Sequence, residues 1–177
     1  MLLIAATERE LVGLDGFVCG VGPVEAALAT ARRLAENAPS GVLHIGIAGT
    51  TTLEVLALVI GSSAVYADVI DPASVFPRVE LVEPDAALLA AARRALPQAH
   101  VLPIATSGKV GGGTTCEVEA MEGFGVLRAC VLAGVPALEL RAISNAVNEA
   151  DRSRWRIEGA LELLSAAVPR VLEAINA

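Results

Sequence analysis

The sequence predicts an α/β protein built on a mixed β-sheet that is flanked by helices. Short apolar runs of strand length alternate with amphipathic segments of helical length, and this alternation is typical of a sheet covered on both faces. Apolar residues make up 54% of the chain and aromatic residues only 3%, so the core must be built from Ala, Val, Leu and Ile. With 177 residues, the chain fits a single domain over residues 1–177, since domains usually hold about 100–200 residues.

The first fifty residues carry four expected elements. Residues 2–6 form an apolar run of the length of a buried strand, and residues 16–21 are expected to form a second strand, ending in a glycine turn. A helix is expected over 23–37, because Pro23 suits a first helical turn, where its missing N–H has no partner. Residues 42–47 form the next apolar run and predict a third strand.

The middle of the chain predicts further sheet segments and one helix. Residues 55–60 and 63–66 are apolar runs on either side of a glycine. Residues 71–77 form a proline-containing connection. A helix is expected over 85–96, and a strand over 101–104.

The last third of the chain holds the most informative pattern. An apolar helix is expected over 117–132, and an amphipathic helix over 157–175. Between them, a short buried strand over 137–142 leads into Ser144 and Asn145. Polar groups at the carboxyl end of a buried strand lie where α/β sheets bind ligands, so the pattern predicts a small-molecule site.

Charge and composition exclude several classes of partner. The net charge is −7 and Lys109 is the only lysine, whereas a nucleic-acid binder needs clustered basic residues. His44 and His100 are isolated, and no His/Cys/Asp group has metal-ligand spacing. We therefore expect no nucleic acid, no metal and no organic cofactor.

The chain also lacks the marks of a membrane or secreted protein. The first ten residues become charged too early for a signal peptide, and the most apolar window, residues 41–60, holds His44 and Glu54, unlike a membrane span. An odd number of widely spaced cysteines, three in all, fits reduced thiols. These features predict a cytoplasmic protein without a membrane anchor.

Two motifs carry a family resemblance. Met121-Glu122-Gly123 and the segment RAISN, which ends at Asn145, resemble the purine nucleosidase and nucleoside phosphorylase superfamily, and within it the futalosine hydrolases of the menaquinone pathway. The resemblance is strongest from Glu119 to Trp155. It implies a three-layer α/β/α fold of the nucleoside phosphorylase type, a nucleoside substrate and a homodimer.

The resemblance implies catalytic roles for two residues. Cleavage of an N-glycosidic bond passes through a sugar cation, so a carboxylate must orient and deprotonate water. The family's water-activating glutamate matches Glu10 rather than Glu8; the alternative is an acidic residue at a solvated helix start. Asn145 matches the position that acts on the departing base, and its amide suits a 6-oxopurine. The alternative for Asn145 is a simple turn former.

Other residues are implied in substrate binding. The family's ribose-binding glutamate and the methionine before it match Glu122 and Met121, although Glu122 could instead form a buried ion pair with Arg128 or Arg141. Ser144 adjoins the base position. The segment GIAGT resembles a turn that lines the sugar and water, which assigns Ile47, Ala48 and Gly49 to the site.

The two glycine turns favour water over phosphate as the nucleophile. Neither residues 20–23 nor residues 46–50 contain an arginine, and phosphorylases need cationic side chains to hold phosphate. An arginine from elsewhere in the fold, or from a partner subunit, would reopen that question.

The weakest point of the resemblance is the segment before Glu117. Relatives usually carry a base-stacking aromatic there, whereas KVGGGTTC has none, so another residue, such as Phe124 or Phe76, would have to cover the base. Trp155 is expected in the core or an interface rather than on the substrate.

The predicted activity is futalosine hydrolysis to hypoxanthine. The alternatives are an adenine nucleosidase, acting on methylthioadenosine, S-adenosylhomocysteine or aminofutalosine, and a non-catalytic nucleoside-binding protein.

Overall fold

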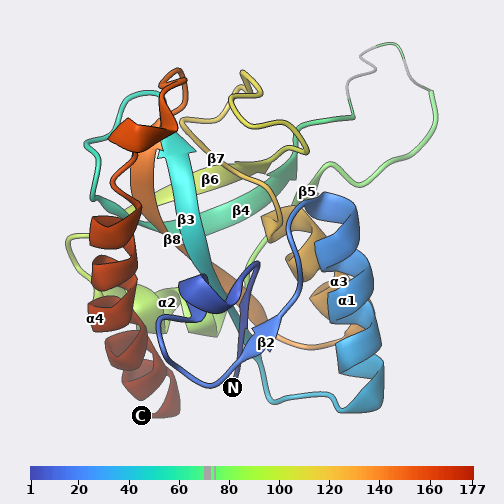
Figure 1. Cartoon of the computed structure of the whole chain (residues 1–177). Coiled ribbons are helices and arrows are strands. Elements are labelled where there is room, and N and C mark those ends of the chain that lie inside the picture. The colour runs from blue at the N-terminus through green and yellow to red at the C-terminus, as the bar shows by residue number, and fades with distance from the viewer. Residues whose placement is uncertain (70–72, 74) are drawn as a thin grey trace.

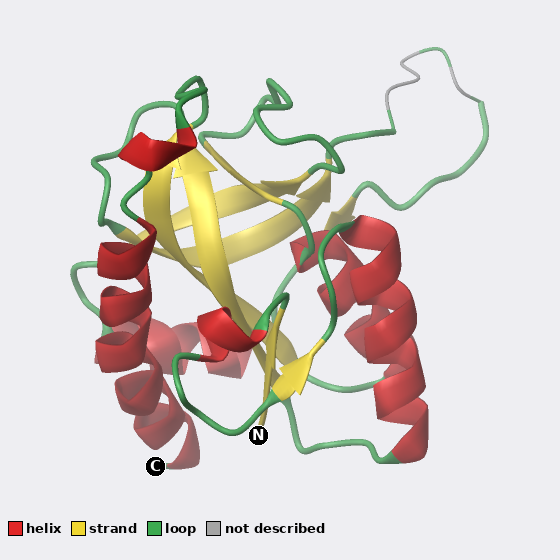
Figure 2. Cartoon of the chain, viewed as in Figure 1, coloured by secondary structure: helices red, strands yellow, loops and turns green. Residues whose placement is uncertain are grey.

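A mixed sheet with helices on both faces forms the frame of the protein (Figures 1 and 2). The computed structural model describes residues 1–69, 73 and 75–177. The strands in these residues are β1 (Leu2–Ala5), β2 (Phe17–Val18), β3 (Val42–Thr50), β4 (Leu58–Tyr66), β5 (Leu81–Val82), β6 (His100–Thr106), β7 (Val118–Ala120) and β8 (Ala137–Ala146). The helices are α1 (Pro23–Glu36), α2 (Ala86–Ala95), α3 (Gly123–Ala133) and α4 (Ile157–Asn176), with 3-10 turns η1 (Glu8–Leu11) and η2 (Arg152–Arg154).

The sheet is mixed, as predicted, and part of it closes on itself. Strand β3 is parallel to β1 and β8 and antiparallel to β7. Strand β7 pairs with β6, β6 pairs with β4, and β4 pairs with β8. Because β8 pairs with both β3 and β4, these five strands form a ring. The carboxyl ends of the parallel strands β1, β3 and β8 therefore meet at one edge, where a ligand site is expected.

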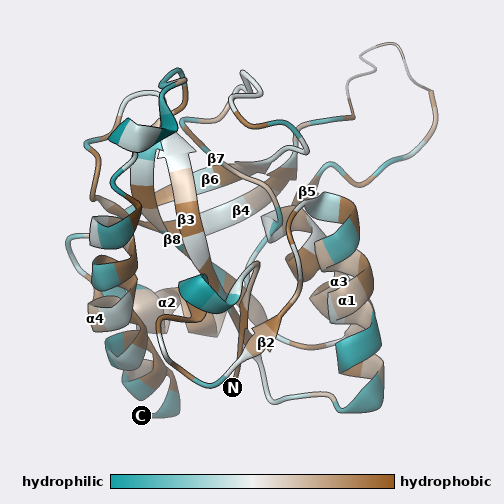
Figure 3. Cartoon of the chain, viewed as in Figure 1, coloured by the Kyte–Doolittle hydropathy of each residue, from teal (hydrophilic) through white to brown (hydrophobic). Residues whose placement is uncertain are grey.

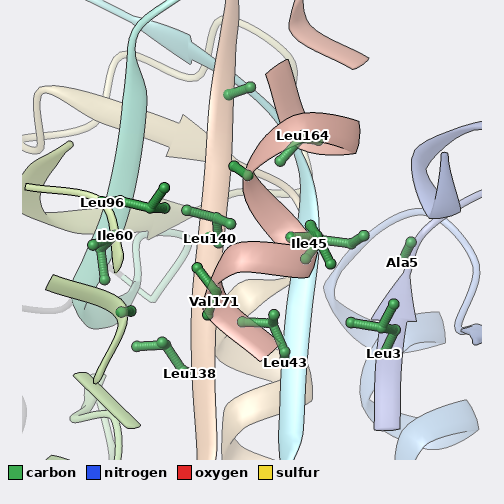
Figure 4. Packing of buried hydrophobic residues seen from close by; sticks show 14 of the residues in the cluster. Leu3, Ala5, Leu43, Ile45, Ile60, Leu96, Leu138, Leu140, Leu164 and Val171 are labelled. Carbon is green, nitrogen blue, oxygen red and sulfur yellow. The ribbon is translucent and has the colours of Figure 1, made fainter. Parts of the chain in front are cut away.

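The helices pack in two pairs on opposite faces of the sheet, α2 with α4 and α1 with α3. Figure 3 shows hydrophilic and hydrophobic bands alternating along α1 and α4, as the amphipathic sequence pattern predicts. The core is aliphatic: Figure 4 shows side chains from β3 and β8 beside Leu164 and Val171 of α4. These strands are covered on both sides and are nearly all buried.

One predicted helix is partly wrong. Residues 117–132 were expected to be helical throughout, but Val118–Ala120 form β7, and α3 begins only at Gly123. The short strand fills the space between β3 and β6, and Val118 is fully buried there. Tertiary pairing has overridden the local pattern. Glu122 still lies at the start of an apolar helix, as its N-cap residue.

Smaller differences concern strand lengths. The segments predicted at 55–60 and 63–66 form the single strand β4, with a register shift between Gly61 and Ser63. Of the connection predicted over 71–77, residues 71, 72 and 74 lie outside the described residues, and the others form neither helix nor strand. In the described part of the chain, no helix is both long and apolar enough to cross a membrane.

Candidate active site

A cavity of about 330 Å³ lies at the carboxyl ends of β1, β3 and β8, next to the start of α3. This is within the usual range of small-molecule sites, roughly 300–1,000 Å³. All eight residues that the sequence assigns to the site line it: Glu10, Ile47, Ala48, Gly49, Met121, Glu122, Ser144 and Asn145. They come from four separate segments, so the fold brings them together.

Glu10 is held from two sides. It lies on η1, just after β1, and is only 8% exposed. Its Oε1 accepts a hydrogen bond from the backbone N–H of Ile47 (3.1 Å), and its Oε2 accepts one from the Thr7 hydroxyl (2.9 Å). These two bonds fix the plane of the carboxylate while leaving further lone pairs for water. Glu8, by contrast, is exposed.

Glu122 lines the cavity at the start of α3. Its Oε1 accepts from the backbone N–H of Gly22 (3.1 Å), and its Oε2 lies 3.5 Å from Nη2 of Arg141. The ion pair with Arg141, considered as an alternative to a binding role, is therefore present. It does not exclude that role, because Glu122 also lines the cavity.

Arg141 is the centre of a buried polar network. Its side chain is fully buried and donates from Nε to Glu139 (2.8 Å), from Nη1 to the Ile47 carbonyl (3.4 Å), and from Nη2 to Nε2 of His44 (2.5 Å). The strand register explains the cluster. Gly46 pairs with Arg141 and His44 pairs with Glu139, and residues two apart on a strand face the same side.

The network sets the protonation of its members. Burial lowers the pKa of His44 well below its ordinary value, and the charge of Arg141 lowers it further. Nδ1 of His44 lies 3.0 Å from the Ile4 carbonyl, so a neutral ring donates there and accepts from Arg141 at Nε2. Burial raises the pKa values of Glu122 and Glu139, while Arg141 opposes the rise at both. Burial disfavours the charge on Arg141, but the three nearby carboxylates outweigh it and raise its pKa.

Gly46 makes room for this network. A Cβ atom there would lie 2.2 Å from Nη1 of Arg141 and 2.8 Å from Oε1 of Glu10. We expect Gly46→Ala to lower the free energy of unfolding by about 1–3 kcal/mol or more through overpacking, and to reduce activity by displacing both side chains. Denaturant unfolding measures the first effect. Gly41→Ala, just before β3, is the matched control, since its added Cβ would meet mainly the flexible end of the Met1 side chain, at 3.1 Å; an equal loss in both variants would contradict this account.

A bulge in β8 places Asn145. Ile143 pairs with Ala48 and Asn145 pairs with Gly49, so Ser144 is the extra residue. The Ser144 hydroxyl lies 2.7 Å from Oδ1 of Asn145, and Nδ2 of Asn145 donates to the Ala146 carbonyl (2.9 Å). This arrangement fixes the orientation of the amide, with its oxygen occupied by Ser144. The second N–H of Nδ2 remains for a ligand.

Several lining residues were missed by sequence reasoning. Trp155, expected in the core or an interface, lines the cavity, and so do Glu119, Arg9 and Lys109. Neither phenylalanine considered as a cover for the base does so. Phe124 stacks on Tyr66 with ring centroids 5.0 Å apart, and Phe76 is 79% exposed. The signal available for Glu119 was its position only two residues before Met121.

The described residues give no sign of a metal centre. They contain no group of three or more His, Cys, Asp or Glu side chains that could hold a metal ion. The three cysteines are free, as predicted. Burial raises the pKa of Cys19 and Cys130 to about 12, so these thiols stay protonated and act as small apolar residues.

Curated relatives match this chain only over short segments. The futalosine hydrolase of Streptomyces coelicolor is 52% identical over 58 residues, which is 33% of this chain and 25% of that enzyme. The futalosine hydrolase of Thermus thermophilus is 46% identical over 55 residues, which is 31% of this chain and 24% of that enzyme. The matches thus span about a quarter of either relative's length.

Solved structures match nearly the whole chain. A methylthioadenosine/S-adenosylhomocysteine nucleosidase from Colwellia psychrerythraea, in complex with adenine, superposes with a TM-score of 0.85 at 21% identity and covers 98% of this chain and 94% of that one. The futalosine hydrolase of Helicobacter pylori gives 0.85 at 18% identity and covers 97% and 96%. These similarities confirm the predicted nucleoside phosphorylase-type fold. The sequence pattern of the phosphorylase superfamily matches residues 16–177, and the chain therefore belongs to that superfamily.

Proposed function

We propose that this protein hydrolyses the N-glycosidic bond of futalosine, releasing hypoxanthine and dehypoxanthine futalosine in menaquinone biosynthesis, without a metal or an organic cofactor. The observation that carries the proposal is the convergence of Glu10, Glu122 and Asn145 on one cavity. These are the groups needed for water, ribose and base. The identities to the two bacterial futalosine hydrolases support the choice of substrate.

The proposed reaction uses each group at a different atom. Glu10 orients a water molecule and takes its proton as the water attacks the anomeric carbon. Glu122 accepts hydrogen bonds from the two ribose hydroxyls, and Met121 packs on the sugar. The negative charge of both carboxylates favours the sugar cation that develops in the transition state. Asn145 forms a hydrogen bond from its second N–H to the departing base, which leaves with the bonding electron pair and takes a proton from solvent, while the Ser144 hydroxyl holds the amide oxygen.

The arrangement around Arg141 supports water rather than phosphate as the nucleophile. Arg9 lines the cavity, but its guanidinium forms an ion pair with Glu158. A second arginine, Arg141, arrives beside Gly46 from β8, as the sequence left open. However, its guanidinium is fully buried and already donates to Glu139, His44 and the Ile47 carbonyl. It also faces Glu122, and Glu10 lies close by. A phosphate there would meet these carboxylates, whereas a neutral water would not.

A chromatographic turnover assay tests the proposal. Futalosine, methylthioadenosine and inosine are compared with and without phosphate. We expect release of hypoxanthine from futalosine, independent of phosphate. A requirement for phosphate would make the protein a phosphorylase, and binding of hypoxanthine without turnover would support a non-catalytic nucleoside-binding protein.

An adenine nucleosidase is the second candidate, since a structural neighbour is a methylthioadenosine/S-adenosylhomocysteine nucleosidase that contains adenine. Asn145 distinguishes the two activities. We expect Asn145→Asp to slow hypoxanthine release by about 10²–10³-fold, the usual cost of removing one donor to developing charge. Adenine release should not fall by this factor. Asn148→Asp, at an exposed position nearby, is the matched control, and an unchanged rate in Asn145→Asp would contradict the assigned role.

We further expect a cytoplasmic homodimer. Apolar side chains that are exposed on the adjacent helices α1 and α3 support an association surface: Val24 and Leu28 (both 66%), Val131 (51%) and Leu132 (72%). Val21, at the turn before α1, is also exposed and lines the cavity. Light scattering during gel filtration measures the assembly, and a monomer at all concentrations would contradict the expectation.

A further inference from the structure

Three neighbouring strands place a row of residues along the lining of the cavity. Gly49 of β3 pairs with Asn145 of β8 on one side and with Glu119 of β7 on the other. Residues that pair directly across strands project to the same face of a sheet. Asn145 and Glu119 therefore flank Gly49. Their backbones are two inter-strand spacings apart, or about 10 Å. All three line the cavity.

Gly49 leaves the middle of this row flat. A Cβ atom at this position would lie 3.2 Å from Nδ2 of Asn145 and 3.3 Å from Val147. Without it, a planar base can lie over the backbone between the two polar side chains. The bulge at Ser144 sets this alignment, because an unbroken register would pair Ser144 with Gly49 and move Asn145 out of the row.

One carboxylate oxygen of Glu119 already accepts a hydrogen bond within the protein, and the other is free to accept one from a ligand. The side chain is 8% exposed, and its Oε1 accepts a hydrogen bond from the backbone N–H of Gly112 (3.1 Å). Within the described residues, Oε2 accepts no hydrogen bond. An acceptor fixed at the wall of a cavity in this way suits a ligand that carries an N–H.

We propose that Glu119 is a specificity-determining residue whose Oε2 accepts the N1–H of a 6-oxopurine base while Asn145 donates to N7 or O6 on the other side. The inference rests on the proposed function and explains how the site would select a 6-oxopurine base. A 6-oxopurine carries hydrogen on N1, whereas N1 of a 6-aminopurine carries a lone pair. The carboxylate attracts the former and repels the latter in the same pose.

Calorimetric binding of free bases tests the assignment. The wild-type protein is expected to bind hypoxanthine about 10–100-fold more tightly than 1-methylhypoxanthine, because a hydrogen bond to a charged acceptor is lost with the N1 hydrogen. In Glu119→Gln, the amide oxygen can still accept from Gly112, which turns the NH₂ group toward the base. This variant should bind hypoxanthine at least about tenfold more weakly and adenine more tightly than the wild type does. Glu117→Gln, exposed and outside the cavity lining, should match the wild type.

The outcomes separate this inference from the proposed function. Equal weakening of hypoxanthine and 1-methylhypoxanthine in Glu119→Gln would mean that Glu119 only anchors the loop at Gly112, and would overturn the inference. So would equal affinity of the wild type for both bases, even with futalosine turnover intact. Failure of the wild type to bind hypoxanthine or to cleave futalosine would overturn the proposed function, and the inference with it.

Discussion

Arg141→Met is expected to lower the free energy of unfolding by about 3–5 kcal/mol, the usual cost of removing one partner from a buried ion pair. The loss would leave Glu139 fully buried with its charge uncompensated. Oε2 of Glu139 already has no hydrogen-bond partner among the described residues, so the carboxyl group depends on Arg141. The same substitution removes the cation beside Glu122, and hypoxanthine release should be lost with it.

Denaturant unfolding of the purified variant measures this effect. Arg154→Met is the matched control, because Arg154 forms an exposed ion pair with Glu149, with 71% of its side-chain surface accessible. Exposed pairs contribute about 0–1 kcal/mol, so its stability should hardly change. A similar loss in both variants would contradict a special role for burial at Arg141.

A second substitution tests the reason for the loss. In the double variant Glu139→Leu/Arg141→Met, the fully buried carboxyl group of Glu139 is gone, and part of the lost stability should return. Activity should not return, because Glu122 would still lack its cation. Recovery of both properties would mean that the network serves folding alone. Recovery of neither would mean that the cost lies in packing around the longer arginine side chain.

The fold was predictable because its elements are locally consistent. Pro23 begins α1, an apolar stripe runs along α4, and the aliphatic runs of β3 and β8 are buried on both faces. Strand β7 was not predictable, since its three residues precede a segment rich in helix formers and take extended structure only through pairing with β3 and β6. Closure of the sheet into a ring likewise depends on the double pairing of β8, which no local pattern records.

The site shows the same division between local motif and long-range register. Glu10, Glu122 and Asn145 could be named from motifs, and they meet in one cavity. The network around Arg141 could not be derived in the same way, because it depends on the pairing of Gly46 with Arg141 across two strands. One clue was present: Glu139 and Arg141 alternate with apolar residues in a buried strand, and opposite charges two residues apart on a strand lie on the same side of the sheet.

Glu10→Gln is expected to slow hypoxanthine release from futalosine by about 10²–10⁴-fold, the usual contribution of a general base. An amide cannot take the proton from water. The fold should tolerate the change, since the amide oxygen can keep the bond from Ile47, and the Thr7 hydroxyl can turn to accept from the NH₂ group. Steady-state kinetics and unfolding curves, measured on the same preparations, separate the two effects.

Glu8→Gln is the matched control, because Glu8 lies two residues earlier on the same turn and is exposed. Its rate should equal that of the wild type. Hypoxanthine affinity should also survive in Glu10→Gln, since Glu10 contacts the water and sugar region rather than the base. If Glu10→Gln keeps the wild-type rate, the general base that deprotonates water must be another carboxylate of the cavity. Glu122 would then be the nearest choice, although its position beside Arg141 suits it to hold hydroxyl groups more than to accept a proton.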